Sequence, residues 1–375
     1  MKKFGLVLVG LVVVLPVLVG VADAGEATRR LVPAMFVLGD STLDVGNNNH
    51  LKGQGVPRAD KPFFGIDFPG GAMSTGRFSN GYNIADFIAK YLGFDRSPVA
   101  YLALKSRNYL IPGAMDRGVS FASAGAGILD STNAGKNIPL SQQVRYMAST
   151  KAAMEAAKGT RKVSKLLADS FFLLGIGSND IILSTAKTPG DIAALFTFLV
   201  SNYTVAITDL YGMGARNLGI INVGPVGCVP LVRVVNATGA CNDGMNRLAM
   251  VLAAKIKSAV ASLATSLPGL SYSLGDSFAF FQPIFANPQA SGFLSVDTAC
   301  CGSGRLGAEG VCMRNSRLCG NRDAYMFWDW VHSTQRVAEL GAQALFQDGP
   351  AQVTAPISFK QLALLACKTC SMMTD

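Results

Sequence analysis

Short apolar runs alternate along the chain with longer segments in which apolar residues recur at helical spacing. Each run is only four to six residues long, which suits a buried strand better than a helix. The predicted strands are residues 35–38, 119–122, 171–176, 218–223 and 270–274. The predicted helices are residues 80–92, 141–167, 191–213, 242–267 and 334–346. Strands that alternate with helices indicate a parallel sheet covered on both faces.

We therefore predict an α/β fold, a three-layer α/β/α sandwich around a mostly parallel sheet of five strands. The 375 residues are half hydrophobic and can bury a large core, and this length permits one domain or more. No Pro/Ser-rich linker, charge block or internal repeat divides the chain, so one domain over 25–375 is the simpler prediction. A Gly/Pro-rich loop over 51–81 lacks periodicity and is predicted to lie near a functional site.

The N-terminal segment, residues 1–24, has the pattern of a secretory signal peptide. Two lysines precede an apolar stretch over 4–21, and Ala22-Asp23-Ala24 supplies small residues at the cleavage positions. We expect cleavage after Ala24 and a secreted, extracellular protein. The alternative is an uncleaved anchor, for which the stretch is near the lower length limit. No other stretch is interpreted as a membrane span, so none is expected in the mature chain.

Secretion changes how the eight cysteines are interpreted. An even number in an oxidising compartment favours disulfides over a metal site. Cys228 and Cys241 would close a short loop, and the four cysteines at 300, 301, 312 and 319 share another loop, where the adjacent two cannot easily bond each other. Cys367 and Cys370 have thioredoxin-like spacing but lie in a tail without a following fold, which argues against a redox role.

The polar surface gives two further indications. Asn202 and Asn236 each begin an acceptor sequon for N-glycosylation, which agrees with secretion. The net charge is +9, but the basic residues are scattered, without a Lys/Arg run or interleaved aromatic residues. This pattern argues against nucleic-acid binding. Weak attraction to an acidic polysaccharide and a merely soluble basic surface remain as alternatives.

The stretch over 36–49, FVLGDSTLDVGNNN, carries the first candidate nucleophile. Gly39 permits a sharp turn, and Ser41 follows the end of the first predicted strand, where open α/β sheets bind ligands. The alternative role for Ser41 is to cap a helix. Ser277 also lies in a Gly-Asp-Ser sequence after a predicted strand, but phenylalanines follow it, which predicts a buried helix start.

The chain holds only two histidines, His50 and His332. A serine nucleophile needs a base, which is usually histidine. His332 follows Asp329 by three residues, so the carboxylate can hold one ring nitrogen while the other faces the serine. We interpret Asp329 as the orienting group and His332 as the base. The alternative is that His332 is an ordinary polar surface residue.

Acyl transfer also needs donors for a developing oxyanion. Candidates are the Ser41 backbone N–H, the glycine backbone at 125–127 and the Asn179 side chain, which all follow predicted strands. Tight packing and a turn are the alternatives for the glycines and for Asn179. The Gly-x-Ser-x-Gly elbow and the Walker sequence are missing, the dinucleotide fingerprint is incomplete, and two histidines are too few for a His-rich metal site.

These motifs together resemble the plant GDSL-type esterase/lipase family, within the SGNH hydrolases. The matching blocks occur in the family's order and span essentially the whole mature chain: FVLGDSTLDVGNNN, GIDFPGG with TGRFSNG, GVSFASAGAGI, GIGSND and YMFWDWVHST. The resemblance implies a flavodoxin-like fold. The departures are Thr42, where the family name has leucine, and Ser333, where proline often follows the histidine.

What the resemblance implies for the site agrees with the residue-based interpretation. Ser41 would be the nucleophile, with Asp329 and His332 as its partners, and the oxyanion donors would be Ser41, Asn179 and Gly127, with Gly125 as second choice. The implied protein is a secreted serine esterase/lipase that forms an acyl-enzyme and needs no metal or cofactor. Its substrates would be acyl lipids or acetylated wall components. Alternatives are an acyltransferase with the same triad and a non-catalytic lipid- or carbohydrate-binding relative.

Overall fold

The computed structural model describes residues 1, 30–71, 75–349 and 352–366. The predicted signal peptide, apart from its first residue, lies outside the described residues, as do Cys367 and Cys370. The α-helices are α1 Asn47–His50, α2 Ile84–Tyr91, α3 Tyr101–Ser106, α4 Leu110–Asp116, α5 Leu140–Lys158, α6 Thr160–Asp169, α7 Ser178–Ile182, α8 Pro189–Met213, α9 Pro230–Arg233, α10 Asp243–Ser266, α11 Ser277–Ala286, α12 Gln335–Phe346 and α13 Phe359–Ala366. Short 3₁₀ turns are η1 Val226–Cys228, η2 Gln289–Ser291, η3 Arg305–Gly307 and η4 Arg322–Ala324.

A five-stranded, mostly parallel sheet forms the centre of the protein. Its strands, in spatial order, are β1 Met35–Gly39, β2 Phe171–Gly175, β3 Asn217–Ile221, β4 Ser271–Gly275 and β9 Thr354–Ala355. The first four are parallel, and β9 is antiparallel to β4. Two small sheets lie outside it and pair β5 Ser295–Ala299 with β8 Tyr325–Phe327 and β6 Cys301–Gly302 with β7 Arg317–Leu318.

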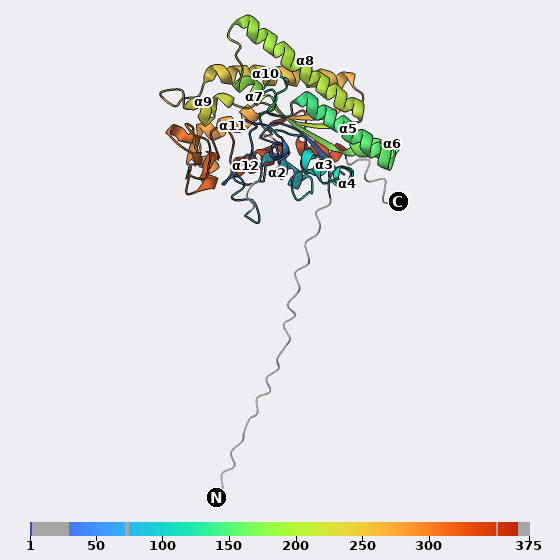
Figure 1. Cartoon of the computed structure of the whole chain (residues 1–375), viewed down its shortest axis with the longest axis horizontal. Coiled ribbons are helices and arrows are strands. Elements are labelled where there is room, and N and C mark those ends of the chain that lie inside the picture. The colour runs from blue at the N-terminus through green and yellow to red at the C-terminus, as the bar shows by residue number, and fades with distance from the viewer. Residues whose placement is uncertain (2–29, 72–74, 350–351, 367–375) are drawn as a thin grey trace.

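Side-chain alternation along the strands creates two apolar faces. In β1, Phe36 and Leu38 join a core with helices α5, α8 and α10, whereas Met35 and Val37 join a second core with α2, α12 and α13. Figure 1 shows α8 and α10 on one side of the sheet and α2 and α12 on the other. The predicted three-layer α/β fold is therefore confirmed.

Several predicted elements differ from the structure. Residues 119–122 do not form a sheet strand, since only Ser120 makes isolated bridges, to Val37 and to Ala100. The fifth strand is instead β9, whose two residues were too few to give a pattern. The predicted helix over 141–167 is broken at Gly159, which has a positive φ of 84° and separates α5 from α6. The helix over 334–346 does not close the fold, because β9 and α13 follow it.

Helices α8 and α10 are long and apolar enough to cross a membrane when length and composition alone are considered. The expectation that only residues 4–21 have this character was therefore wrong by that measure. Each helix also places an apolar face in the protein core: Leu199 and Ile207 of α8 and Leu252 and Ile256 of α10 are buried there. Length and composition alone do not distinguish a core helix of this kind from a membrane-spanning helix.

The predicted disulfides are confirmed for the six cysteines that the structure describes. The pairs are Cys228–Cys241, Cys300–Cys319 and Cys301–Cys312. The last two brace the segment around β6 and β7, which is hydrogen-bonded to β8 and its continuation: the Cys300 and Cys301 N–H groups donate to the Phe327 and Trp328 carbonyls at 3.0 and 2.7 Å. These disulfides thus support the strand that leads into Asp329.

Candidate active site

Ser41 lies in the turn that follows β1, at the carboxyl edge of the sheet. Its side chain is half-buried, between buried Asp40 and exposed Thr42. Gly39, the last residue of β1, is needed for close packing, because a Cβ there would lie 2.5 Å from the Gly175 carbonyl oxygen of β2. The Asp40 N–H donates to that same carbonyl at 3.1 Å, so the turn is anchored to the neighbouring strand.

Asp329 and His332 lie in a tight turn directly after β8. One oxygen of the buried Asp329 carboxylate accepts hydrogen bonds from the Val331 and His332 N–H groups at 2.9 and 2.8 Å. Both carboxylate oxygens also lie within 2.9 Å of His332 Nδ1. The carboxylate therefore holds Nδ1 and fixes the ring, which leaves Nε2 as the nitrogen that can act on another group.

The His332 imidazole lines a cavity of about 210 Å³. Asp40 and Thr42, the two neighbours of Ser41, line the same cavity, as does Ser178, the residue before Asn179. Burial raises the pKa of Asp40 from 3.8 to about 6, against the lowering effects of hydrogen bonds from Thr42 and of the charge on His332. The Ser41 turn and the Asp329–His332 turn thus meet at one cavity.

The glycine-rich segment after residue 122 lies beside this turn. The Ser123 N–H donates to the Gly39 carbonyl at 3.0 Å, and the Asn179 side-chain amide donates to the Ala126 carbonyl at 2.9 Å. A Cβ at Gly127 would lie 2.5 Å from Asp180 Oδ1, so this position tolerates only glycine. The structure therefore brings Gly127 next to Asn179 and the end of β1.

Two backbone donors at this place are unused. Within the described ranges, neither the Ser41 N–H nor the N–H of buried Gly127 has a hydrogen-bond partner. Buried backbone N–H groups are nearly always paired, so the one at Gly127 is available to a ligand oxygen. Gly125 is less buried than Gly127 and lies in a turn, where it has a positive φ of 79°. Its carbonyl accepts hydrogen bonds from the side-chain amides of Asn133 and Asn137.

Two other candidates from the sequence are placed differently. His50 is exposed at the end of α1 and is not among the residues that line the cavity. Ser277 does line the cavity and begins α11, as predicted, but it is only partly buried. Its hydroxyl donates to the Asn222 carbonyl at 2.8 Å, and its N–H donates to the Asn222 side-chain oxygen at 3.1 Å. The Ser277 hydroxyl is therefore engaged with the backbone.

Two buried carboxylates that sequence reasoning did not single out hold the site loops together. Asp44 accepts hydrogen bonds from the N–H groups of Gly46, Asn47 and Ala124 at 2.7 to 3.0 Å, and burial raises its pKa to about 6. Asp180 accepts from the Ile128 N–H at 2.8 Å, and its pKa is also raised by burial. Each carboxylate ties a strand-end turn to the glycine-rich segment.

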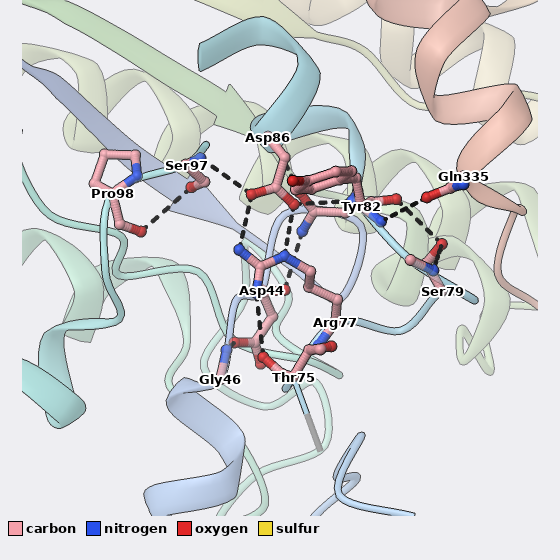
Figure 2. A network of polar contacts seen from close by, with 12 residues as sticks. Asp44, Gly46, Thr75, Arg77, Ser79, Tyr82, Asp86, Ser97, Pro98 and Gln335 are labelled. Atoms are coloured by element: carbon pink, nitrogen blue, oxygen red, sulfur yellow. Dashed lines mark hydrogen bonds and ion pairs between the residues drawn. The ribbon is translucent and has the colours of Figure 1, made fainter. Parts of the chain in front are cut away.

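A buried ion pair between Arg77 and Asp86 anchors a segment that lines the cavity, and Figure 2 shows the polar contacts around this pair. Arg77 makes two bonds of 2.6 and 2.7 Å to the Asp86 carboxylate of α2. Asp86 also forms a capping box with Asn83, and the Asn83 side chain donates to the Asp44 carbonyl at 3.0 Å. Phe78, the residue after Arg77, packs on the His332 ring with 4.8 Å between ring centroids. The predicted functional role of the 51–81 loop agrees with this placement.

The donor groups present do not suggest a metal centre. Within residues 30–71, 75–349 and 352–366, no group of three or more His, Cys, Asp or Glu side chains is arranged to hold a metal ion. The site instead combines a serine turn, a carboxylate-held imidazole and unpaired backbone donors. These are the parts that acyl-transfer chemistry requires.

Comparison with known proteins assigns the chain to a family. The GDSL-like Lipase/Acylhydrolase family model matches residues 35–345. One GDSL esterase/lipase of Arabidopsis thaliana is 36% identical over 348 residues, which cover 89% of this chain and 90% of that protein. A second is 35% identical over 96% of this chain and 94% of its own length. The anther-specific proline-rich protein APG of Brassica napus is 32% identical over 84% of this chain and 72% of its own. The chain therefore belongs to the GDSL-like lipase/acylhydrolase family and is a carboxylic ester hydrolase.

Proposed function

We propose that this hydrolase cleaves its esters through a Ser41–His332–Asp329 triad and a covalent acyl-enzyme. One observation carries the proposal: the Asp329 carboxylate holds His332 Nδ1, and the same imidazole lines the cavity that both neighbours of Ser41 line. A base that is oriented by a carboxylate and placed beside a serine is the arrangement that activates a hydroxyl for attack.

The chemical steps follow from this arrangement. Ser41 Oγ attacks the ester carbonyl carbon while His332 Nε2 accepts the hydroxyl proton. The Ser41 N–H, the Gly127 N–H and the Asn179 amide stabilise the oxyanion of the tetrahedral intermediate. As the intermediate collapses, His332 gives its proton to the departing alcohol. Water then attacks the acyl-enzyme with His332 again as base, which releases the acid and restores Ser41. These steps use no metal or organic cofactor.

The proposed setting of the protein is extracellular, with residues 1–24 removed and 25–375 forming one domain. The described disulfides support an oxidising compartment. Asn202 is exposed on α8, and Asn236 is partly exposed in a loop after α9, where N-glycans can be accommodated. We place the protein in the apoplast or cell wall, with acylated lipids or acylated wall components as substrates.

Substitution of the two histidines tests the proposed triad. His332→Ala should lower kcat on a short-chain aryl ester by roughly 10²- to 10⁴-fold, because the general base is lost. The matched variant His50→Ala should keep wild-type turnover, since His50 is exposed outside the cavity. Stopped-time hydrolysis assays on both purified variants measure this difference. An inactive His50→Ala protein together with an active His332→Ala protein would contradict the assignment of the base.

A further inference from the structure

The cavity beside His332 is much larger than a single small acyl group requires. Its volume of about 210 Å³ is several times the roughly 30 Å³ that a water molecule occupies in the liquid. A methyl group is only slightly larger than a water molecule. An acetyl ester would therefore leave most of this space unfilled.

The wall of the cavity is apolar and aromatic over most of its extent. Phe280, Phe281 and Phe285 of α11 contribute one side of it. No Lys or Arg is present among the lining residues. Polar side chains are the minority of the lining: Asp40, Thr42, Ser79, Asn83, Ser178, Asn222, Asp276, Ser277, His332 and Ser333. A cavity of this composition favours an uncharged hydrocarbon chain over a sugar, which would need many hydrogen-bonding partners.

Another part of the cavity wall runs along helix α12. Ala338, Gly341 and Leu345 line it and recur at the spacing of one helical face. Seven residues separate the first from the last, which corresponds to about 10 Å along the helix axis. Helix α12 begins three residues after His332, so this apolar wall extends away from the imidazole for several carbon–carbon bond lengths.

We propose that this cavity holds a linear fatty acyl chain of medium length, so that the enzyme acts on fatty-acyl esters in preference to acetyl esters. This inference rests on the Ser41 site proposed above. The cavity is lined by both neighbours of Ser41, by the residue before Asn179 and by His332, so it opens beside the place where the proposed mechanism puts the ester carbonyl. The acyl chain is the part of the ester that is bonded to that carbon and stays there in the acyl-enzyme.

A series of 4-nitrophenyl esters that differ only in acyl length tests the preference. From acetate through butyrate to octanoate, kcat/KM should rise by roughly fourfold per methylene, because each buried methylene gains hydrophobic free energy. Equal rates on acetate and octanoate, or a preference for acetate, would overturn the inference.

A cavity-filling variant shows whether this cavity causes the preference for longer acyl chains. Ala338→Leu adds volume to the α12 wall and should lower the octanoate-to-acetate ratio of kcat/KM by at least tenfold. The matched control is Ala344→Leu on the same helix, because Ala344 does not line the cavity. The octanoate-to-acetate ratio of kcat/KM of this control should equal that of the wild type. An unchanged ratio in Ala338→Leu would place the chain elsewhere and overturn the proposal.

Two further measurements complete the test. The first asks whether the cavity binds the acyl chain or the alcohol of the ester, and the second asks whether the cavity binds a chain when the proposed triad is disabled. Methyl octanoate should be hydrolysed faster than octyl acetate, and the reverse order would overturn the acyl assignment. Calorimetry with the uncleavable ketone 2-decanone should show binding to the Ser41→Ala protein and weaker binding when Ala338→Leu is added. Absence of binding would overturn the cavity inference. Binding without any ester hydrolysis by the wild-type protein would instead contradict the proposed triad.

Discussion

Asp40 is the carboxylate that lies between the end of β1 and the proposed nucleophile. Its desolvation in the protein raises its pKa to about 6, and the nearby His332 charge acts in the opposite direction. An anion at this position favours the protonated imidazole, which cannot serve as a base. The ionisation of Asp40 is therefore coupled to the proposed step in which His332 accepts the serine proton.

Asp40→Asn should move the acid limb of the pH–activity profile to lower pH. The substitution removes the negative charge that attracts the protonated ring, so the anion no longer opposes the formation of the neutral base. The asparagine oxygen can still accept the two hydrogen bonds that Asp40 Oδ1 accepts from the Thr42 N–H and hydroxyl. The profile of kcat/KM against pH, with exposed Asp209→Asn as control, measures the shift. If the acid limb of the Asp40→Asn profile were unchanged, or lay at higher pH, the proposed coupling between Asp40 and His332 would be contradicted.

At the residue scale, sequence reasoning selects as candidates the residues whose chemical type is rare. With two histidines in the chain, His332 stood out because Asp329 precedes it by three residues. Asp44 and Asp180 did not stand out, because their partners Ala124 and Ile128 lie 80 and 52 residues away. Gly39 was predicted to permit a turn, whereas the structure shows that its close approach to β2 excludes a side chain.

At the scale of elements, the segment over 75–83 depends on one buried ion pair. The Arg77 and Asp86 side chains are 8% and 0% exposed, so neither charge is solvated by water. The same segment places Phe78 on the His332 ring. Its position over the cavity is therefore coupled to the stability of the Arg77–Asp86 contact.

Arg77→Met should lower the free energy of unfolding by about 3–5 kcal/mol, because it leaves the Asp86 carboxylate buried without its partner. Arg336→Met is the matched control. It breaks an ion pair with Glu339 in which both side chains are more than a third exposed, and it should cost less than about 1 kcal/mol. Urea unfolding followed by circular dichroism measures both. Equal losses in the two variants would contradict the role assigned to Arg77.

The elements with a long, regular pattern were predicted well, and the short ones were not. Helices α8 and α10 begin and end within two residues of their predicted limits, because their apolar spacing extends over many turns. Residues 119–122 are apolar enough for a strand. The segment runs beside β1 and forms two backbone hydrogen bonds with Val37, but this makes an isolated bridge and not a sheet strand. The pairing of β9 with β4 depends on tertiary contacts that a two-residue segment cannot signal.

At the scale of the whole molecule, the sheet topology brings distant parts of the sequence to one edge. Ser41 follows β1, Asn179 follows β2, and Asp329 and His332 follow β8 near the end of the chain. The β8 segment is held by its pairing with β5 and by the neighbouring disulfides. In Figure 1 these late segments form the orange lobe at one end of the sheet. The alternation of strands and helices predicted the shared edge, but not the small sheets that carry Asp329 and His332 there.

Labelling with a fluorophosphonate probe tests the central claim, that Ser41 is the activated nucleophile, most directly. The probe reacts with a serine only when a positioned base draws on its proton. The account predicts a single label per folded chain, on the peptide that contains Ser41. Ser41→Ala should abolish both label and turnover, and Ser277→Ala, whose hydroxyl is bonded to the Asn222 carbonyl, should keep both. A label on Ser277, or a folded protein that takes no label, would contradict the account.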